Sequence, residues 1–222
     1  MDVSLDTDIT IHLYNAGKEE LLFKYFDKCY MHEFILEREI KNKSVAVYNK
    51  IKEEIENDKI IKVTQKYLID IKMKKNFENK VYELRTLFDF GETNAVALAS
   101  VLGIAALVTD DTKDQGPHDT LVKEYVEDII PFSFYELLYL DYLQSDDDYD
   151  KLKEDFDVIN KAAYPQYPME FVSRIKRVVR RFSRNGSDRD IKWMRDFCNT
   201  YNINYRGSMQ NLKLHLQLEL EN

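Results

Sequence analysis

The segment GETNAVALASVLGIAALVTDD, residues 91–111, decides the fold because it joins two elements that both look buried. Its first half is apolar on all sides, which predicts a helix covered on every side, and Gly103 favours the end of that helix. Residues 104–109 form a continuous apolar run, as expected for a central parallel strand covered on both faces. This strand is predicted to end at Asp110 and Asp111.

Further strands are predicted on both sides of this segment. They are Val3 to Leu5, Lys28 to Met31, Ile60 to Val63 and Asp128 to Phe132. Between them, apolar residues recur at helical spacing over residues 34–55 and 67–88. Strands that alternate with helices imply right-handed crossovers and a parallel sheet. We therefore expect residues 1–143 to form an α/β domain with three layers, α/β/α, around a central parallel sheet.

The acidic run at residues 145–148 marks the expected domain boundary. Beyond it, apolar residues at helical spacing predict helices within residues 152–159, 171–182 and 191–201. The last leucine run, 212–220, alternates like a strand, but its Leu, Lys, Gln and Glu composition favours a helix, for which Ser208 is a possible cap. Residues 144–222 are therefore expected to form an all-helical extension that contains a basic helix.

Composition excludes several classes of protein. The net charge of −8 argues against a general nucleic-acid coating protein. No apolar run has the length needed to cross a bilayer, and the Met1-Asp2-Val3 start lacks the pattern of a signal peptide, so we expect a cytoplasmic protein without a membrane partner. Cys29 and Cys198 are isolated, which gives no support for a zinc site or a disulfide framework.

Acidic residues follow two of the predicted strands. Asp6-Thr7-Asp8 comes after the first strand, and Asp110-Asp111 comes after the run 104–109. In an open parallel sheet, ligands bind beyond the carboxyl ends of the strands. Clustered carboxylates repel one another unless a hard cation such as Mg²⁺ or Mn²⁺ lies among them. This pattern predicts a hydrolase of phosphate esters that uses a metal-activated water. In the simpler interpretation, these acids only cap the helices that follow.

Two stretches resemble the PIN-domain nuclease family. Leu5-Asp6-Thr7-Asp8-Ile9 is similar to the opening motif of that family, with Asp8 where asparagine is more common. Residues 91–111 resemble its buried helix, central strand and acid pair, because the Gly-Glu start, alanine-rich helix, glycine break and Thr-Asp-Asp ending occur in order. The resemblance spans residues 1–143. It implies a PIN-like fold and a divalent-metal-dependent endoribonuclease, often the toxin of a toxin–antitoxin pair.

The resemblance also implies a set of functional acids and partners. Asp6, Glu92 and Asp110 match three metal-site acids of the family, and Glu39 best matches the remaining acid, with Glu37 as the alternative. The expected catalytic residues are Asp6, Glu39, Glu92 and Asp110, and the expected metal ligands are Asp6, Glu92, Asp110 and Asp111, with Asp114 as a possible addition. The implied cofactor is Mg²⁺ or Mn²⁺, the implied substrate is RNA, and an antitoxin is an implied protein partner.

Two other functions are compatible with the sequence. Asp6-Thr7-Asp8-Ile9-Thr10 fits the DxDxT signature of haloacid-dehalogenase-like phosphatases, in which Asp6 would be the nucleophile and Asp8 the general acid/base. Thr64, Lys80, Asp110 and Asp114 would complete that site. The residues after Thr10 lack the glycine-rich turn usual there, and Glu92 would have no role. In the third hypothesis, the PIN-like domain is a non-catalytic interaction module.

A basic helix is predicted from Met169 to Arg184. Its arginines recur three or four residues apart, opposite an apolar face, and the expected nucleic-acid-binding residues are Arg174, Arg177, Arg180, Arg181 and Arg184. Such a cationic face beside a nuclease site would contact the RNA backbone. Alternatively, these arginines pair with the acids of residues 146–157, within the chain or across a homodimer.

Overall fold

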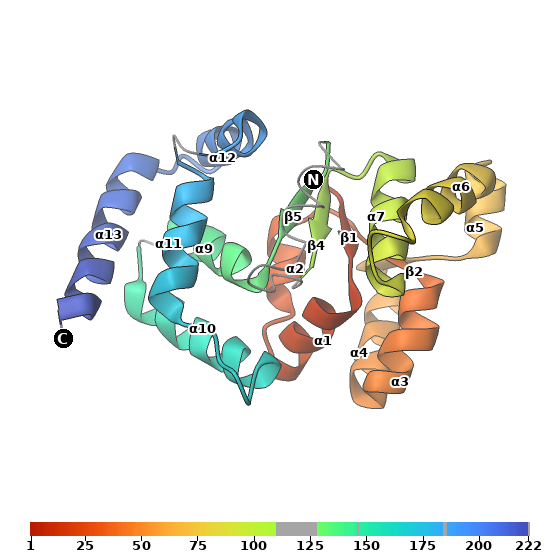
Figure 1. Cartoon of the computed structure of the whole chain (residues 1–222), viewed down its shortest axis with the longest axis horizontal. Coiled ribbons are helices and arrows are strands. Elements are labelled where there is room, and N and C mark those ends of the chain that lie inside the picture. The colour runs from red at the N-terminus through yellow and green to blue at the C-terminus, as the bar shows by residue number, and fades with distance from the viewer. Residues whose placement is uncertain (110–127, 146, 184–185, 222) are drawn as a thin grey trace. The chain divides into compact units, whose positions relative to one another are not determined.

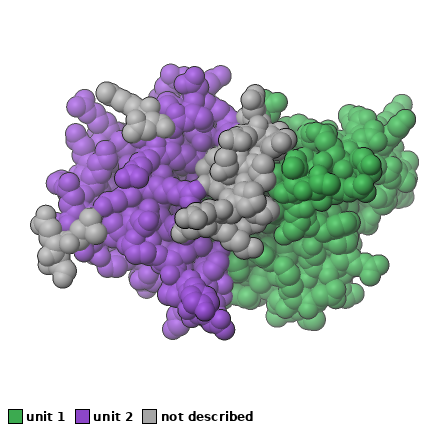
Figure 2. All heavy atoms as spheres, in the orientation of Figure 1, with its two compact units in different colours: residues 1–134 green, residues 135–222 purple. Residues whose placement is uncertain are grey.

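The structure, a computed structural model, divides the chain into two compact units. They are Met1–Phe134 and Tyr135–Asn222, coloured separately in Figure 2. The division falls after the first residue of helix α9 (Phe134–Gln144), whereas the sequence predicts a boundary near the end of this segment. Helix α9 belongs with the second unit because the ring of Tyr139 stacks on that of Phe182. The residues described are 1–109, 128–145, 147–183 and 186–221.

The described part of the first unit contains a five-stranded parallel sheet (Figure 1). Its strands are β1 (Val3–Leu5), β2 (Cys29–His32), β3 (Ile60–Val63), β4 (Ala106–Val108) and β5 (Ile130–Phe132), in the spatial order β3-β2-β1-β4-β5. Every residue of β1, β4 and β5 is buried. Because successive side chains of a strand point to opposite faces, both faces of the sheet centre are covered. The expected α/β class with a parallel sheet is confirmed.

Helices connect β1 to β2, β2 to β3 and β3 to β4. The first crossover contains α1 (Thr7–Ala16) and α2 (Glu20–Tyr25), and the second contains the π-helix η1 (Ile35–Ile40), α3 (Lys41–Lys43) and α4 (Val45–Glu56). The third contains α5 (Gln65–Asp70), α6 (Lys74–Leu84) and α7 (Phe90–Leu102). Helix α7 packs against β1, β2 and β4, and Ser4 Oγ donates a hydrogen bond to the Ala95 carbonyl at 2.9 Å. Helix α7 therefore covers the sheet centre, as its apolar composition predicts.

Two segments predicted as continuous helices are interrupted. The segment 34–55 breaks at Ser44, which is extended and whose Oγ accepts a hydrogen bond from the Val47 amide at 3.3 Å. The segment 67–88 breaks between α5 and α6, where Lys72 has a left-handed backbone with φ of 61°. The apolar residues keep their helical spacing across both breaks, because a local cap or turn can end a helix without changing that spacing.

The second unit is helical throughout its described residues. After α9 it contains α10 (Tyr149–Ala163), α11 (Phe171–Arg181), α12 (Asp188–Thr200) and α13 (Tyr205–Glu221). The leucine-rich end is a helix, as its composition favours, but it begins before Ser208, so that residue does not cap it. Asn204 Oδ1 accepts a hydrogen bond from the Gly207 amide at 3.2 Å instead. Among the described residues, no helix is both long and apolar enough to cross a membrane.

Candidate active site

Asp6 lies at the centre of the carboxyl edge of the sheet. The chain moves from β1 to β2 and β3 on one side and then crosses to β4 and β5 on the other, so the strand order reverses between β1 and β4. Ligands of open α/β sheets bind at such a switch point. Asp6 follows β1, and its side chain is 6% exposed. Its Oδ1 accepts a hydrogen bond from the Thr7 amide at 2.7 Å, and its Oδ2 accepts one from Thr109 Oγ1 at 3.1 Å.

Glu39 and Asp6 are linked by hydrogen bonds to the same residue, Thr7. The Thr7 backbone amide binds Asp6, and the Thr7 hydroxyl donates a hydrogen bond to Glu39 Oε2. Glu39 is part of the π-helix η1, a rare form of helix that often occurs at functional sites. One residue therefore links two carboxylates that are far apart in the sequence.

Glu37, the alternative acid, lies in different surroundings. Its Oε2 accepts a hydrogen bond from the Tyr48 hydroxyl at 3.0 Å, and its Oε1 lies 2.5 Å from Lys62 Nζ. The bond from Lys62 lowers the pKa of the Glu37 carboxyl group. The structure thus brings Glu39, and not Glu37, to the Thr7 side of this helix.

The amino end of α7 forms another wall of the site. Gly91 lies so close to Glu39 that a Cβ atom at this glycine would be 2.5 Å from Glu39 Oε2. Asp89 caps the helix, because its Oδ1 accepts a hydrogen bond from the Glu92 amide at 3.0 Å. Glu92, the next residue after Gly91, is 4% exposed. The first turn of α7 therefore places a second buried acid next to the glycine that contacts Glu39.

Burial and neighbouring acids raise the pKa values of Asp6 and Glu39. Burial raises the pKa of Asp6 to about 7, and the charges of Asp8 and Asp89 add to the increase. Burial also raises the pKa of Glu39, with Asp89 and Asp8 again contributing. A raised carboxyl pKa means that the ionised form is disfavoured in this environment, and a nearby cation reverses that preference.

Asp8 differs from Asp6 in exposure and in partner. The Asp8 side chain is exposed, and its Oδ1 lies 2.6 Å from Lys43 Nζ. The side chains of this ion pair are 58% exposed for Asp8 and 50% exposed for Lys43. The phosphatase hypothesis also requires Thr64 and Lys80. Thr64 Oγ1 caps α5 by accepting a hydrogen bond from the Tyr67 amide at 3.1 Å, and Lys80 pairs with Glu83 at 3.1 Å. Asp8, Thr64 and Lys80 are therefore each engaged by another residue of the chain.

Several predicted residues lie outside the described part of the chain. They are Asp110, Asp111, Asp114 and Arg184. Within the described residues, no group of three or more His, Cys, Asp or Glu side chains is arranged to hold a metal ion. Asp6, Glu39 and Glu92 are the expected acids that lie within the described residues.

The expected nucleic-acid-binding face of α11 needs a correction at Arg181. This side chain is buried and paired, with Nη1 2.6 Å from Glu136 Oε1 and Nε 2.7 Å from Asp190 Oδ2. Arg181 therefore does not belong to an exposed cationic face, and these two acidic partners lie outside residues 146–157. Arg180 is exposed, and Arg174 and Arg177 are half-buried.

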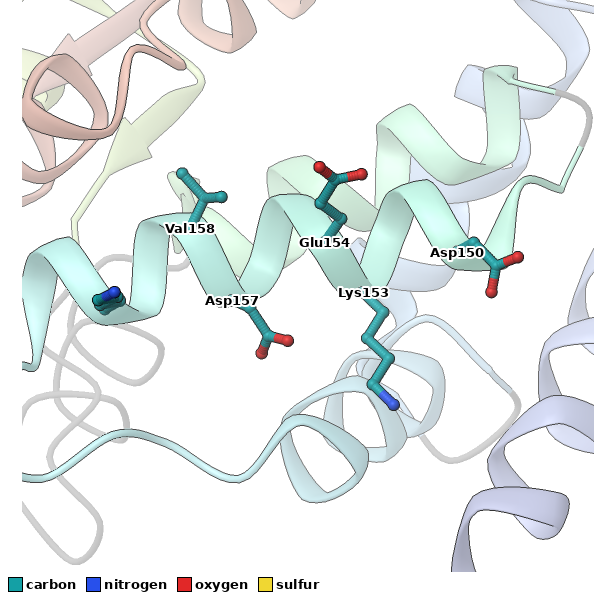
Figure 3. A pocket seen from close by; sticks show the side chains of 6 residues that line it. Asp150, Lys153, Glu154, Asp157 and Val158 are labelled. Carbon is teal, nitrogen blue, oxygen red and sulfur yellow. The ribbon is translucent and has the colours of Figure 1, made fainter.

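The acid-rich helix α10 carries a shallow hollow (Figure 3). It is lined by Asp150, Lys153, Glu154, Asp157, Val158 and Lys161. The Glu154 and Asp157 carboxylates point to different sides of the helix in Figure 3. Lys153 Nζ lies 2.6 Å from Glu219 Oε1. This hollow does not bring its acids together on one ligand, in contrast to the edge of the sheet.

Sequence reasoning missed several residues of the site. Asp89 had a recognisable signal, because an Asp three residues before a Glu at the start of an apolar helix is a capping pattern. Thr7 and Lys43 had none, since only the folded chain brings them to Glu39 and Asp8.

Comparisons of the chain with protein-family models, with curated proteins and with solved structures find no match.

Proposed function

We propose that this protein is a divalent-metal-dependent endoribonuclease of the PIN-like type, which hydrolyses RNA phosphodiesters with an activated water. The observation that carries the proposal is the bridge formed by Thr7, which holds the carboxylates of Asp6 and Glu39 together at the edge of the sheet. The β1–β4 switch point supports the presence of a ligand there. The choice of RNA rests on the resemblance of residues 5–9 and 91–111 to PIN-domain nucleases.

The residues at this edge suit Mg²⁺ or Mn²⁺. Carboxylate oxygens are the ligands that these hard cations prefer, and the raised pKa values of Asp6 and Glu39 are what a bound cation would lower. Because Gly91 has no side chain, the Glu39 carboxylate occupies space that the side chain of any larger residue would fill. Asp6 and Glu39 would hold the metal, together with Glu92, Asp110 and Asp111 as expected from the family. When bound, the metal supplies an activated water and neutralises phosphate charge.

The protein itself contributes orientation and proton handling. Thr7 and Thr109 hold the two Asp6 oxygens by separate hydrogen bonds, which fixes the plane of the carboxylate. The Thr7 hydroxyl does the same for one oxygen of Glu39. Because burial raises its pKa, Glu39 takes up a proton more readily than an exposed glutamate does. A bound metal would lower this pKa, so Glu39 would release that proton as the metal binds.

Glu39 and Glu37 provide a matched test of the proposal. Glu39→Gln is expected to lower the RNA cleavage rate by about a hundredfold or more, because it removes a charge from the metal site. Glu37→Gln is expected to leave the rate within about threefold of the wild-type value, because Glu37 pairs with Lys62. Cleavage of a labelled single-stranded RNA would be followed with Mn²⁺, with Mg²⁺ and with EDTA, and a DNA of the same sequence would test the choice of substrate.

Three results would count against the proposal. Cleavage that persists in EDTA would remove the role of the metal, and equal rates for the two variants would remove the role of Glu39. Trapping of beryllium fluoride on Asp6 would favour the phosphatase function instead.

Gly91→Ala tests the close contact between α7 and Glu39. The new methyl group must displace the Glu39 carboxylate, so we expect RNA cleavage to fall by about tenfold or more. Stability should hold or rise by about 1 kcal/mol, because alanine favours a helix over glycine. The control is Gly207→Ala in α13, where a Cβ atom would lie 2.7 Å from Asn204 Nδ2. It makes a similar contact in the second unit, and its cleavage rate should match that of the wild type. Equal rates for both variants would contradict the contact's importance.

A further inference from the structure

Lys43 is a cation placed among the acids of the proposed active site. It is the last residue of α3, which directly follows the π-helix that carries Glu39. Its Nζ atom lies 2.6 Å from Asp8 Oδ1. Burial opposes the charge of the ammonium group, but the hydrogen bond to Asp8 and the charges of Glu39 and Asp6 outweigh it, so the pKa of Lys43 is raised. Asp8, with smaller contributions from Glu39 and Asp6, therefore favours the charged form of Lys43.

The neighbouring Lys41 faces a different set of groups. Its Nζ atom lies 5.3 Å from the centre of the Tyr48 ring, and its charge contributes to the lowered pKa of Glu37. The two lysines of α3 thus divide between the two glutamates of η1. Lys43 belongs to the Glu39 side, where the proposed site lies, and Lys41 belongs to the Glu37 side.

The Lys43–Asp8 pair is built so that it exchanges easily. The Lys43 side chain is 50% exposed and that of Asp8 is 58% exposed, and an ion pair this accessible to water contributes little to stability. An approaching phosphate offers the ammonium group a replacement anion at little cost. A site lined by carboxylates repels the phosphodiester backbone, so a cation besides the metal favours substrate binding.

We propose that Lys43 binds a phosphate group of the nucleic-acid substrate next to the Asp6 and Glu39 carboxylates, leaving Asp8 when the substrate enters. This inference rests on the proposed nuclease function and adds a substrate-binding residue to it. Lys43 would contact the phosphate backbone of the nucleic acid, so it would bind every RNA sequence alike, whereas contacts to bases would discriminate between RNA sequences.

The test compares Lys43→Met with Lys41→Met in the full chain. For a single-stranded RNA and Mn²⁺, Lys43→Met is expected to raise KM by about tenfold, as the loss of one charge-assisted contact does, with kcat changed by less than about twofold. Between about 50 and 200 mM NaCl, the slope of log(1/KM) against log[salt] should become shallower by about 0.7, the value for one phosphate contact on a single strand. Lys41→Met should show the wild-type KM and slope. Lys43→Arg should restore most of the affinity, because it restores the charge.

A readout without RNA separates substrate binding from effects on the carboxylates. Titration calorimetry with Mn²⁺ should give Lys43→Met an affinity equal to or tighter than that of the wild type, since a nearby positive charge is removed. A loss of Mn²⁺ binding, a fall in kcat at unchanged KM, or no rescue by arginine would each overturn the phosphate-binding role. A wild-type chain that cleaves no RNA with Mn²⁺ would defeat the nuclease function and this inference together. Cleavage with an unchanged KM for Lys43→Met would defeat the inference alone.

Discussion

Replacing Asp6 by asparagine is expected to abolish metal-dependent RNA cleavage and, in the same variant, to stabilise the metal-free protein. Asparagine has the shape of aspartate and keeps an acceptor for the Thr7 amide. Its amide group can donate to Thr109 Oγ1, because a hydroxyl both donates and accepts. The fold is therefore retained while the charge that would bind the metal is lost. We expect the cleavage rate to fall by about a hundredfold or more.

The effect on stability follows from the pKa of Asp6. Burial raises this pKa to about 7 in the folded chain, compared with about 3.9 for an unfolded aspartate. The folded state thus binds the proton more tightly, and the wild-type protein loses stability as the pH rises from about 4 through about 7. Asparagine has no such loss. At pH 8 in EDTA, Asp6→Asn should be more stable than the wild type by about 2–4 kcal/mol.

Urea denaturation at pH 5 and pH 8 measures this difference. The gain in the midpoint of Asp6→Asn over the wild type should be larger at pH 8, and addition of Mn²⁺ should raise the midpoint of the wild type only. Asp27→Asn is a suitable control, because Asp27 is an exposed residue that pairs with the amino terminus. An Asp6→Asn variant less stable than the wild type at pH 8 would contradict the raised pKa of Asp6, because asparagine caps a helix as well as aspartate does.

Replacing Arg181 by methionine should cause the largest loss of stability. Arg181 Nη1 lies 2.6 Å from Glu136 and Nε lies 2.7 Å from Asp190, and all three side chains are less than one-tenth exposed. Removing one member of a buried ion pair costs about 3–5 kcal/mol, because its partner loses a compensating charge in a low-dielectric interior. Glu136 lies in the first turn of α9 and Asp190 in the first turn of α12, so the loss should weaken packing across the second unit.

Trp193 reports on this part of the chain. It is the one tryptophan of the sequence, and its ring stacks on Phe197 with centroids 5.3 Å apart. The fluorescence midpoint in urea should fall for Arg181→Met, whereas Arg180→Met, at the exposed neighbouring position, should stay within about 0.5 kcal/mol of the wild type. RNA binding of Arg181→Met should change no more than its folded fraction does. A stable Arg181→Met variant with weakened RNA binding would restore the role first expected of this arginine.

The order of elements and the place of the acids follow from local patterns. The short apolar runs, including Ile60 to Val63, are strands in the structure, and the helix predicted before Gly103 ends there, with a left-handed backbone at the glycine. These features depend on neighbouring residues only. Once strands alternate with helices, the sheet is parallel, and an acid directly after a strand lies at its carboxyl edge. The position of Asp6 was thus predictable.

Other features depend on which distant residues meet. The sequence positions of Glu37 and Glu39 do not show which of the two faces Asp6. The π-helical turn and the contacts of Glu39 with Gly91 and Thr7 place only Glu39 on the Asp6 side. Arg180 and Arg181 are adjacent and chemically identical, yet one is exposed and the other is buried.

The sequence by itself therefore determined the strands, their alternation with helical segments and the edge at which Asp6 lies, because hydrophobic period and chain direction are local properties. Only the tertiary structure decided that Thr7 joins Asp6 to Glu39, that Lys43 faces them, and that Arg181 is enclosed by Glu136 and Asp190. The physical reason is that burial and the electrostatic interactions between side chains depend on contacts between distant segments, and those contacts exist only when the chain is folded.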